Sequence, residues 1–196
     1  MRAKKIDSFK ALTKHDKKAA KLLIELARLT EAVTLEGINI GTFGLTSTGK
    51  STLLNSLLGE KKTETGAGET TSQVTAYSSK QFTLWDAPGR NDETVYMTME
   101  YISFFKGLTR RLILIQSSIK ENSSMMKLLD EIDLSYDIVM NKFDLVDEDE
   151  RQKLQNQIQR EIETLELKRV NKVFFVSAKH PTMFPDWDVM IDYLTN

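Results

Sequence analysis

The chain has 196 residues, of which 40% are apolar and 28% charged, so it can bury one core and does not resemble a disordered or fibrous protein. Its 27 basic and 28 acidic side chains leave a net charge of −1, which does not favour a nucleic-acid-binding protein. The absence of cysteine excludes disulfide scaffolds, thiol catalysis and cysteine-ligated metals, and two histidines argue against a histidine-rich metal site. No apolar run reaches the ~18 residues of a membrane span, and the N-terminus lacks the apolar core of a secretion signal. We therefore expect a cytoplasmic protein, with peripheral membrane contact as the alternative.

The first 36 residues predict a basic helical extension. Residues 1–28 carry nine Lys or Arg against three acidic side chains, a local charge of +6 that the near-neutral total conceals. Apolar residues recur at three- and four-residue steps without Gly or Pro, which predicts one amphipathic helix over 8–35. We expect Leu23, Leu26 and Val33 to pack on the rest of the protein, with the lysines in solvent. A partner helix, an anionic membrane or RNA are the alternative contacts for this helix.

Alternating strands and helices follow Gly37 and predict a second unit, residues 37–196. Short runs rich in β-branched and aromatic residues are typical of strands that are covered on both faces. Strands are expected at 38–43, 73–79, 81–86, 112–117, 136–140 and 172–177. Helices are expected at 50–58, 93–106, 122–132, 148–166 and 186–194. This order favours an α/β fold, a three-layer sandwich around a mostly parallel six-stranded sheet with right-handed crossovers.

A glycine-rich segment joins the first strand of this unit to its first helix. Residues 44–51 read GLTSTGKS and fit G-x-x-x-x-G-K-[ST]. The two glycines let the backbone wrap a phosphate, so that N–H groups point inward at the positive end of a helix. In this pattern the lysine neutralises the β- and γ-phosphates and the final hydroxyl coordinates Mg²⁺. The pattern predicts a phosphate site at Gly44, Ser47, Thr48, Gly49, Lys50, Ser51 and Thr52.

Two short motifs at later strand ends predict guanine as the base. The first, NKFD, follows strand 136–140 at the edge where open α/β sheets bind ligands. Its Asp144 carboxylate can accept hydrogen bonds from the guanine N1–H and C2 amine, whereas adenine would leave that charge unmatched. Lys142 can cover the purine with its stem, and Asn141 can tie this loop to the phosphate loop. The second motif ends the last strand, and its central N–H is expected to donate to guanine O6: Ser177, Ala178 and Lys179.

A DAPG segment and an upstream threonine pair predict the sensor of the γ-phosphate. Asp86 is expected to hold a Mg²⁺-bound water, and the Gly89 N–H is expected to reach the γ-phosphate, where a side chain would be in the way. A threonine from GAGETT should complete the metal shell, and we favour Thr71 over Thr70. The predicted Mg²⁺ ligands are therefore Ser51, Thr71 and Asp86.

Together these motifs, in this order, resemble the guanine-nucleotide-binding (G) domain of P-loop GTPases over about residues 36–196. GKSTLLN, the threonine pair and DAPG make the chain most similar to the Era-like and dynamin-like groups. The resemblance implies Mg²⁺-dependent binding of GTP, its hydrolysis to GDP and phosphate, and a conformational switch. Ser47 matches the serine of dynamin-like proteins, whereas potassium-activated Era-like relatives carry Asn there. Although this chain departs from those relatives at Ser47, a monovalent cation is kept as a further candidate cofactor.

The glutamine that orients water in related domains is missing from its usual places. The position that follows D-x-x-G, which holds Gln in Ras-type domains, is Arg90, and the glutamine position of dynamin-like proteins is Thr46. Such a loss implies slow intrinsic turnover. We expect catalysis to use Lys50, Ser47 and the loop of Thr71, completed by a nucleotide-bridged homodimer or an activating partner. The alternative is a GTP-binding module that hydrolyses little unaided, and NKFD argues against an ATP-using P-loop kinase.

Overall fold

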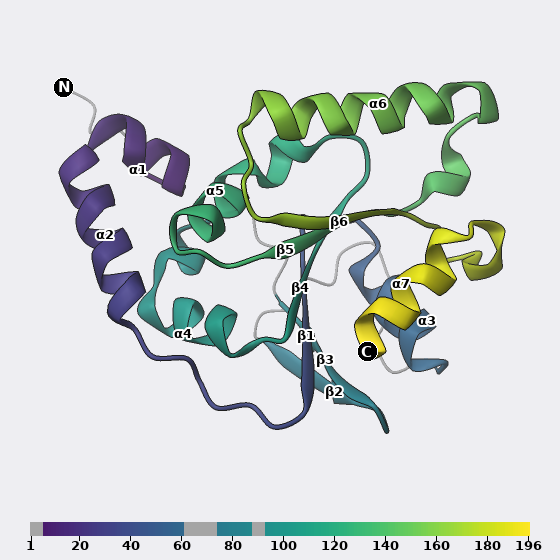
Figure 1. Ribbon diagram of the computed structural model, residues 1–196, viewed down its shortest axis with the longest axis horizontal. Coiled ribbons are helices and arrows are strands. Elements are labelled where there is room, and N and C mark those ends of the chain that lie inside the picture. Colours follow the sequence, from purple (N-terminus) through teal and green to yellow (C-terminus); the bar gives the residue numbers. More distant parts are fainter. Residues whose placement is uncertain (1–5, 61–73, 88–92) are drawn as a thin grey trace.

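A six-stranded sheet forms the centre of the computed structural model, which describes residues 6–60, 74–87 and 93–196 (Figure 1). The strand order is β2-β3-β1-β4-β5-β6, and every neighbouring pair is parallel except β2 with β3. The strands are β1 (Ile38–Phe43), β2 (Thr75–Ser78), β3 (Phe82–Asp86), β4 (Arg110–Ile115), β5 (Tyr136–Met140) and β6 (Val170–Phe175). The predicted fold class, an α/β sandwich on a mostly parallel six-stranded sheet, is confirmed.

Helices cover both faces of this sheet, because its central strands are apolar on both sides. One face carries α3 (Lys50–Leu58) and α7 (Asp186–Thr195), and the other carries α4 (Met99–Gly107), α5 (Ser123–Glu131) and α6 (Glu148–Thr164). Along β4, Leu112 and Leu114 face the first layer, whereas Ile113 and Ile115 face the second. Short 3₁₀ helices complete the described elements: η1 (Glu93–Met97), η2 (Ile119–Asn122), η3 (Phe143–Leu145) and η4 (Pro181–Met183).

The N-terminal segment forms two helices, so the prediction of one helix over 8–35 was wrong. α1 (Phe9–His15) and α2 (Lys17–Leu29) meet at Asp16, whose backbone is not helical. The Asp16 carboxylate accepts the Ala19 N–H at 2.9 Å and so caps the start of α2. A short acidic side chain favours this cap over a helix interior, which the spacing of apolar residues does not reveal.

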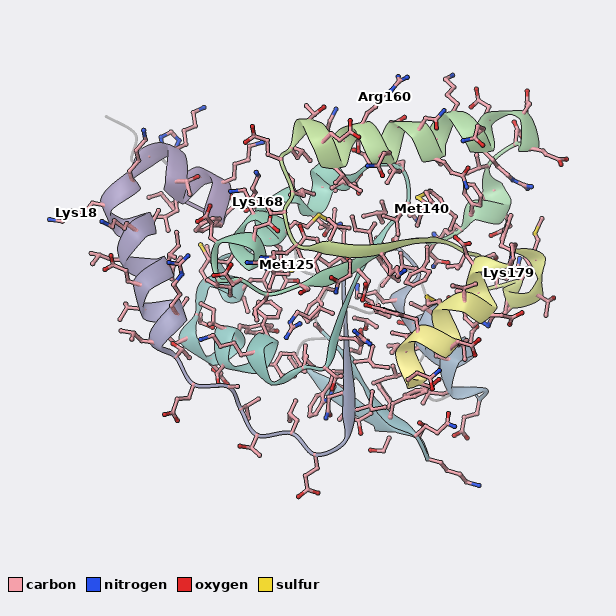
Figure 2. The ribbon with its side chains drawn as sticks, viewed as in Figure 1. Lys18, Met125, Met140, Arg160, Lys168 and Lys179 are labelled. Carbon is pink, nitrogen blue, oxygen red and sulfur yellow. The ribbon has the colours of Figure 1, made fainter. Side chains whose placement is uncertain are left out.

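The two N-terminal helices lie against α4 and α5 (Figure 1), but of the three residues predicted to pack there only Leu23 packs on the core. Leu26 and Val33, expected to be buried, are 55% and 40% exposed. Leu26 lies about 100° around the helix from the buried Ala27, and Val33 lies beyond the end of α2. Leu23 packs on the core as predicted, and the other contact residues are Phe9, Ala20, Ile24 and Ala27. The lysines of α1 and α2 are in solvent as predicted, and Figure 2 shows Lys18 pointing away from the protein.

Two strands begin two residues earlier than predicted because polar residues enter the sheet. β4 starts at Arg110, and the guanidinium of Arg111 is buried. Arg111 donates hydrogen bonds to the carbonyls of Phe105, Leu108 and Ser135 at 2.7, 2.9 and 3.0 Å, which makes its burial tolerable. β6 starts at Val170, and its early polar residues are exposed at the sheet edge.

Within the described residues, no helix is both long and apolar enough to cross a membrane.

The predicted helix over 93–106 is divided into η1 and α4. Thr98 separates them, because its hydroxyl accepts the Tyr101 N–H at 3.3 Å and caps α4. Figure 2 shows Met125 and Met140 inside the protein, where both side chains belong to the core.

Replacing Asp137 with asparagine is expected to stabilise the fold at neutral pH. Asp137 is 1% exposed near the start of β5, and burial raises its pKa from 3.8 to about 6. The hydroxyl of Tyr193 donates to it at 3.1 Å and the Arg110 guanidinium donates to that hydroxyl, but neither offsets the desolvation. Between the two pKa values the folded state holds a proton that the unfolded chain has lost. The free energy of unfolding therefore falls as pH rises through that window.

Asparagine keeps an acceptor for Tyr193 without a charge, so Asp137→Asn should raise the free energy of unfolding at pH 7.5 by at most about 3 kcal/mol. Thermal unfolding should show a midpoint several degrees higher at pH 7.5 and almost unchanged at pH 4. Asp192→Asn, an exposed change on α7, is the control. An Asp137→Asn midpoint that shifts equally at both pH values would contradict this account.

Candidate functional site

The glycine-rich loop connects β1 to α3 at the carboxyl edge of the parallel strands. Gly44 and Gly49 adopt φ values of 140° and 87°. A Cβ on Gly44 would lie 2.6 Å from the Leu114 carbonyl oxygen, and one on Gly49 would lie 2.4 Å from the Asn141 side-chain nitrogen. Both positions therefore require glycine. Ser47, in the middle of the loop, is also left-handed, with a φ of 70°.

The ammonium group of Lys50 lies within this loop. It donates to the carbonyls of Gly44 at 2.9 Å and Leu45 at 3.3 Å. Burial lowers the pKa of Lys50, although the charge of Asp86 acts in the opposite direction. The loop thus holds a partly desolvated cation beside the N-terminus of α3, and this arrangement favours a polyanion.

Two oxygen donors predicted to bind Mg²⁺ come from neighbouring elements. Ser51 lies in the first turn of α3, and Asp86 ends β3, which packs against α3. Asp86 is 2% exposed, and its charge acts on both Lys50 and Tyr77. In the described segments, no group of three or more His, Cys, Asp or Glu could hold a metal. Mg²⁺ commonly binds through one carboxylate, water and substrate phosphates, so this donor set fits that ion.

Several predicted residues cannot be placed. The γ-phosphate sensor Gly89 and the metal ligand Thr71, together with its competitor Thr70, lie outside the described residues. The same holds for Arg90, the position that carries glutamine in Ras-type domains.

A cavity of about 220 Å³ opens beside the phosphate loop, at the carboxyl ends of β5 and β6. It brings together residues of the phosphate loop, the NKFD motif and the final strand motif, which are far apart in the sequence. Its lining consists of Gly49, Thr52, Asn141, Lys142, Asp144, Leu145, Ser177, Ala178 and Lys179. Figure 2 shows Lys179 at the end of the protein opposite Lys18, so this cavity is remote from α2.

Asn141 joins the three segments around this cavity. Its side-chain nitrogen donates to the Thr48 carbonyl at 2.9 Å, which is the link to the phosphate loop predicted from the sequence. Its side-chain oxygen accepts the Ala178 N–H at 3.0 Å. The N–H predicted to donate to guanine O6 is therefore bonded to Asn141 here, because a buried amide needs its own partners. Ser177 is fully buried, and its hydroxyl accepts the His180 N–H at 3.0 Å.

Asp144 is presented on a short 3₁₀ turn, η3, whose position is fixed by Phe143. Phe143 is 3% exposed, packs on Phe175 and Phe184, and donates its N–H to the Val176 carbonyl at 3.0 Å. This anchoring places the half-buried Asp144 side chain on the cavity wall.

Two side chains converge on the carbonyl of Ser47. Lys142, which is itself left-handed, donates to it from the ammonium group at 2.7 Å. Gln116 donates from its side-chain amide at 2.5 Å. Gln116 belongs to no motif, and the only signal in the sequence is a polar residue that ends a buried apolar strand.

Comparison with known proteins agrees with this geometry. The family model described as 50S ribosome-binding GTPase matches residues 39–179. The chain belongs to this GTPase family. GTPase Der from Haemophilus influenzae is 28% identical over 160 residues, which cover 74% of this chain and 31% of that protein. GTPase Der from a Marinomonas species is 26% identical over 174 residues, 81% of this chain and 38% of that protein. The chain thus spans about a third of the length of these curated relatives.

Solved structures share the P-loop GTPase fold. The Aquifex aeolicus Era structure with GDP·AlF₄⁻ has a TM-score of 0.58 at 17% identity, over 82% of this chain and 56% of that one. A probable GTP-binding protein EngB has a TM-score of 0.55 at 18% identity, over 79% and 94%. Elongation factor SelB from Methanococcus maripaludis, with a GTP analogue, reaches 0.57 at 20% identity, over 84% and 35%. The predicted resemblance to Era-like GTPases is confirmed.

Proposed function

We propose that this chain binds GTP and GDP with Mg²⁺, hydrolyses GTP to GDP and phosphate, and acts as a nucleotide-dependent switch. One observation carries the proposal: Asn141 joins the phosphate loop to the two motifs that would read guanine, around a single cavity. Membership of the GTPase family supports the same chemistry.

Each part of the nucleotide has a candidate partner. Lys50 and the loop N–H groups would hold the phosphates, and Asp144 would accept hydrogen bonds from the base. Because the Ala178 N–H is bonded to Asn141, the neighbouring N–H of Lys179 is the better candidate for O6. Ser51, Asp86 and Thr71 would hold Mg²⁺, which neutralises developing charge on the β- and γ-phosphates when bound.

The water-orienting group remains to be supplied, and we propose two sources. The first is Ser47, whose exposed side chain lies at the left-handed turn of the phosphate loop. The second is a protein partner, either an activating protein or a second copy in a nucleotide-bridged dimer. A GTP-binding module with little hydrolysis of its own is the competing function, because Thr46 and Arg90 occupy the usual glutamine positions.

Contacts of the N-terminal helices belong to the same proposal. The outer face of α2 exposes three leucines, Leu22, Leu26 and Leu29, at 51%, 55% and 81%. This face is a candidate contact for a partner protein, with an anionic membrane or RNA as the alternatives because of the lysines around it. If Leu26→Ser loses binding to a partner protein while its affinity for GDP is unchanged, the result would support the protein contact.

Equilibrium binding and turnover test the proposal. In Mg²⁺, the purified protein should bind GDP and GTP at least about 100-fold more tightly than ADP and ATP, since guanine alone satisfies the Asp144 carboxylate. Phosphate release should then be followed at increasing protein concentration, with K⁺ or Na⁺. A rate per molecule that rises with concentration favours the dimer, and a rate near zero throughout favours the binding module. Equal affinity for ATP and GTP, or no binding of either, would refute the proposal.

A further inference from the structure

The position of Gln116 in the fold places it between two nucleotide-binding loops. It is the first residue after β4, which lies between β1 and β5 in the sheet. The phosphate loop follows β1 and the NKFD motif follows β5. A side chain that leaves the carboxyl end of β4 can therefore reach both loops, and the Gln116 amide bonds the Ser47 carbonyl at 2.5 Å.

The peptide group between Ser47 and Thr48 is the one that these contacts orient. Ser47 adopts φ 70°, a conformation that costs a residue with a side chain roughly 1–2 kcal/mol and so needs external support. A carbonyl oxygen has two lone pairs, and here Gln116 and Lys142 occupy both. Both donors hold the oxygen on the side of the loop that faces β4 and β5.

Because a peptide group is planar, the Thr48 N–H points away from that oxygen, into the loop. There it donates a long hydrogen bond to the Leu45 carbonyl, with 3.4 Å between nitrogen and oxygen. The Thr48 hydroxyl at 2.9 Å and the Lys50 ammonium at 3.3 Å point at the same Leu45 oxygen. Three donors thus converge on one oxygen inside the loop, the Leu45 carbonyl, and a phosphate oxygen could accept from the same donors in its place.

We propose that Gln116 is a positioning residue of the phosphate loop: its amide holds the Ser47 carbonyl outward and so aims the Thr48 N–H at the phosphates. The inference rests on the proposed nucleotide binding and deepens it. Lys142 shares this task but also lines the base cavity, whereas Gln116 does not line that cavity. Gln116 should therefore affect binding of the diphosphate and not recognition of guanine.

Gln116→Met tests this role, because methionine has nearly the same length and no donor. Its affinity for GDP should fall about 3- to 10-fold, the value of one hydrogen bond, with a matching rise in the GDP dissociation rate. Affinity for GMP, which lacks the β-phosphate, should change less than about twofold, as should the preference for GDP over ADP. Displacement of a fluorescent GDP by GDP, GMP and ADP measures the three affinities. Ser117→Ala, an exposed change one residue away, should match the wild type in each.

Gln116→Glu provides a second variant of the same shape should the methionine variant fold poorly. Its carboxylate cannot donate and is repelled by the Ser47 carbonyl, so the GDP-specific loss should be at least as large. An equal fall for GDP and GMP, or no change for GDP, would overturn the inference. If the wild type binds ADP and GDP with equal affinity, the proposed guanine recognition fails. The role of Gln116 can still be tested in that case, by comparing the effect of the substitution on ADP affinity with its effect on AMP affinity. A wild type that binds no nucleotide would overturn both.

Discussion

Replacing Asp144 with asparagine is expected to weaken GDP binding about 100-fold, because two charge-assisted hydrogen bonds from guanine depend on this carboxylate. The side chain lies on the cavity wall, and the buried Phe143 fixes the turn that carries it. Guanine offers two donors, N1–H and the C2 amine, to one acidic group. An asparagine oxygen accepts from only one of them, while its own amide hydrogens face the other.

The same substitution should create affinity for xanthosine diphosphate. Xanthine has a carbonyl oxygen at C2 in place of the amine, so asparagine can donate there and still accept from N1–H. Displacement of fluorescent GDP by GDP, XDP and ADP measures the three affinities. Asp147→Asn is the matched control, because it makes the same change at an exposed position that does not line the cavity. Unchanged GDP affinity in Asp144→Asn would show that another group reads the base.

The sequence predicted the helix and strands next to the candidate site well where neighbouring residues alone determine their bounds. The predicted bounds of α3 and β1 are those observed. For α3 the reason is visible, because it lies between Gly49 and Gly59, both in the left-handed region that favours glycine. β1 and β5 are short and mostly apolar, and the motifs at their ends meet at one edge of the sheet.

Predictions failed where a polar side chain finds a partner distant in the sequence. Arg111 is inside the sheet because three carbonyls accept its guanidinium hydrogen bonds, and those carbonyls cannot be identified from spacing. Asp16 divides the N-terminal helix by capping its second half. The contact of Gln116 could not be predicted for the same reason. Its role depends on the order of the strands in the sheet, which places the end of β4 beside the phosphate loop. The Ala178 N–H donates to Asn141 in the fold, a bond that spacing does not reveal, and its contact with guanine O6 stays a prediction.

Replacing Lys50 with methionine is expected to weaken GDP and GTP binding about 100- to 1000-fold, the usual effect of removing one partner from a buried pair of opposite charges. Methionine fills the space of the lysine stem but leaves the phosphates with N–H donors alone. The nucleotide-free protein should nevertheless keep its thermal midpoint. Burial lowers the pKa of Lys50, which means that desolvation of its charge costs the fold free energy. Methionine removes this desolvation cost, and the gain offsets the loss of the hydrogen bonds to Gly44 and Leu45.

The two measurements together distinguish a ligand role from a structural one. Titration of GDP should show the large loss, and thermal unfolding should show a midpoint within about 3 °C of the wild type without nucleotide but no rise on adding GDP. Lys80→Met, an exposed change between β2 and β3, should leave both unchanged.

Because the pKa of Lys50 is lowered, wild-type affinity for GDP should also decline in alkaline solution, at a lower pH than that at which an ordinary lysine loses its proton. In Lys50→Met the decline should be smaller, because only the deprotonation of guanine N1–H then contributes. A variant that loses affinity only because its midpoint collapses would mean that Lys50 supports the fold and not the triphosphate.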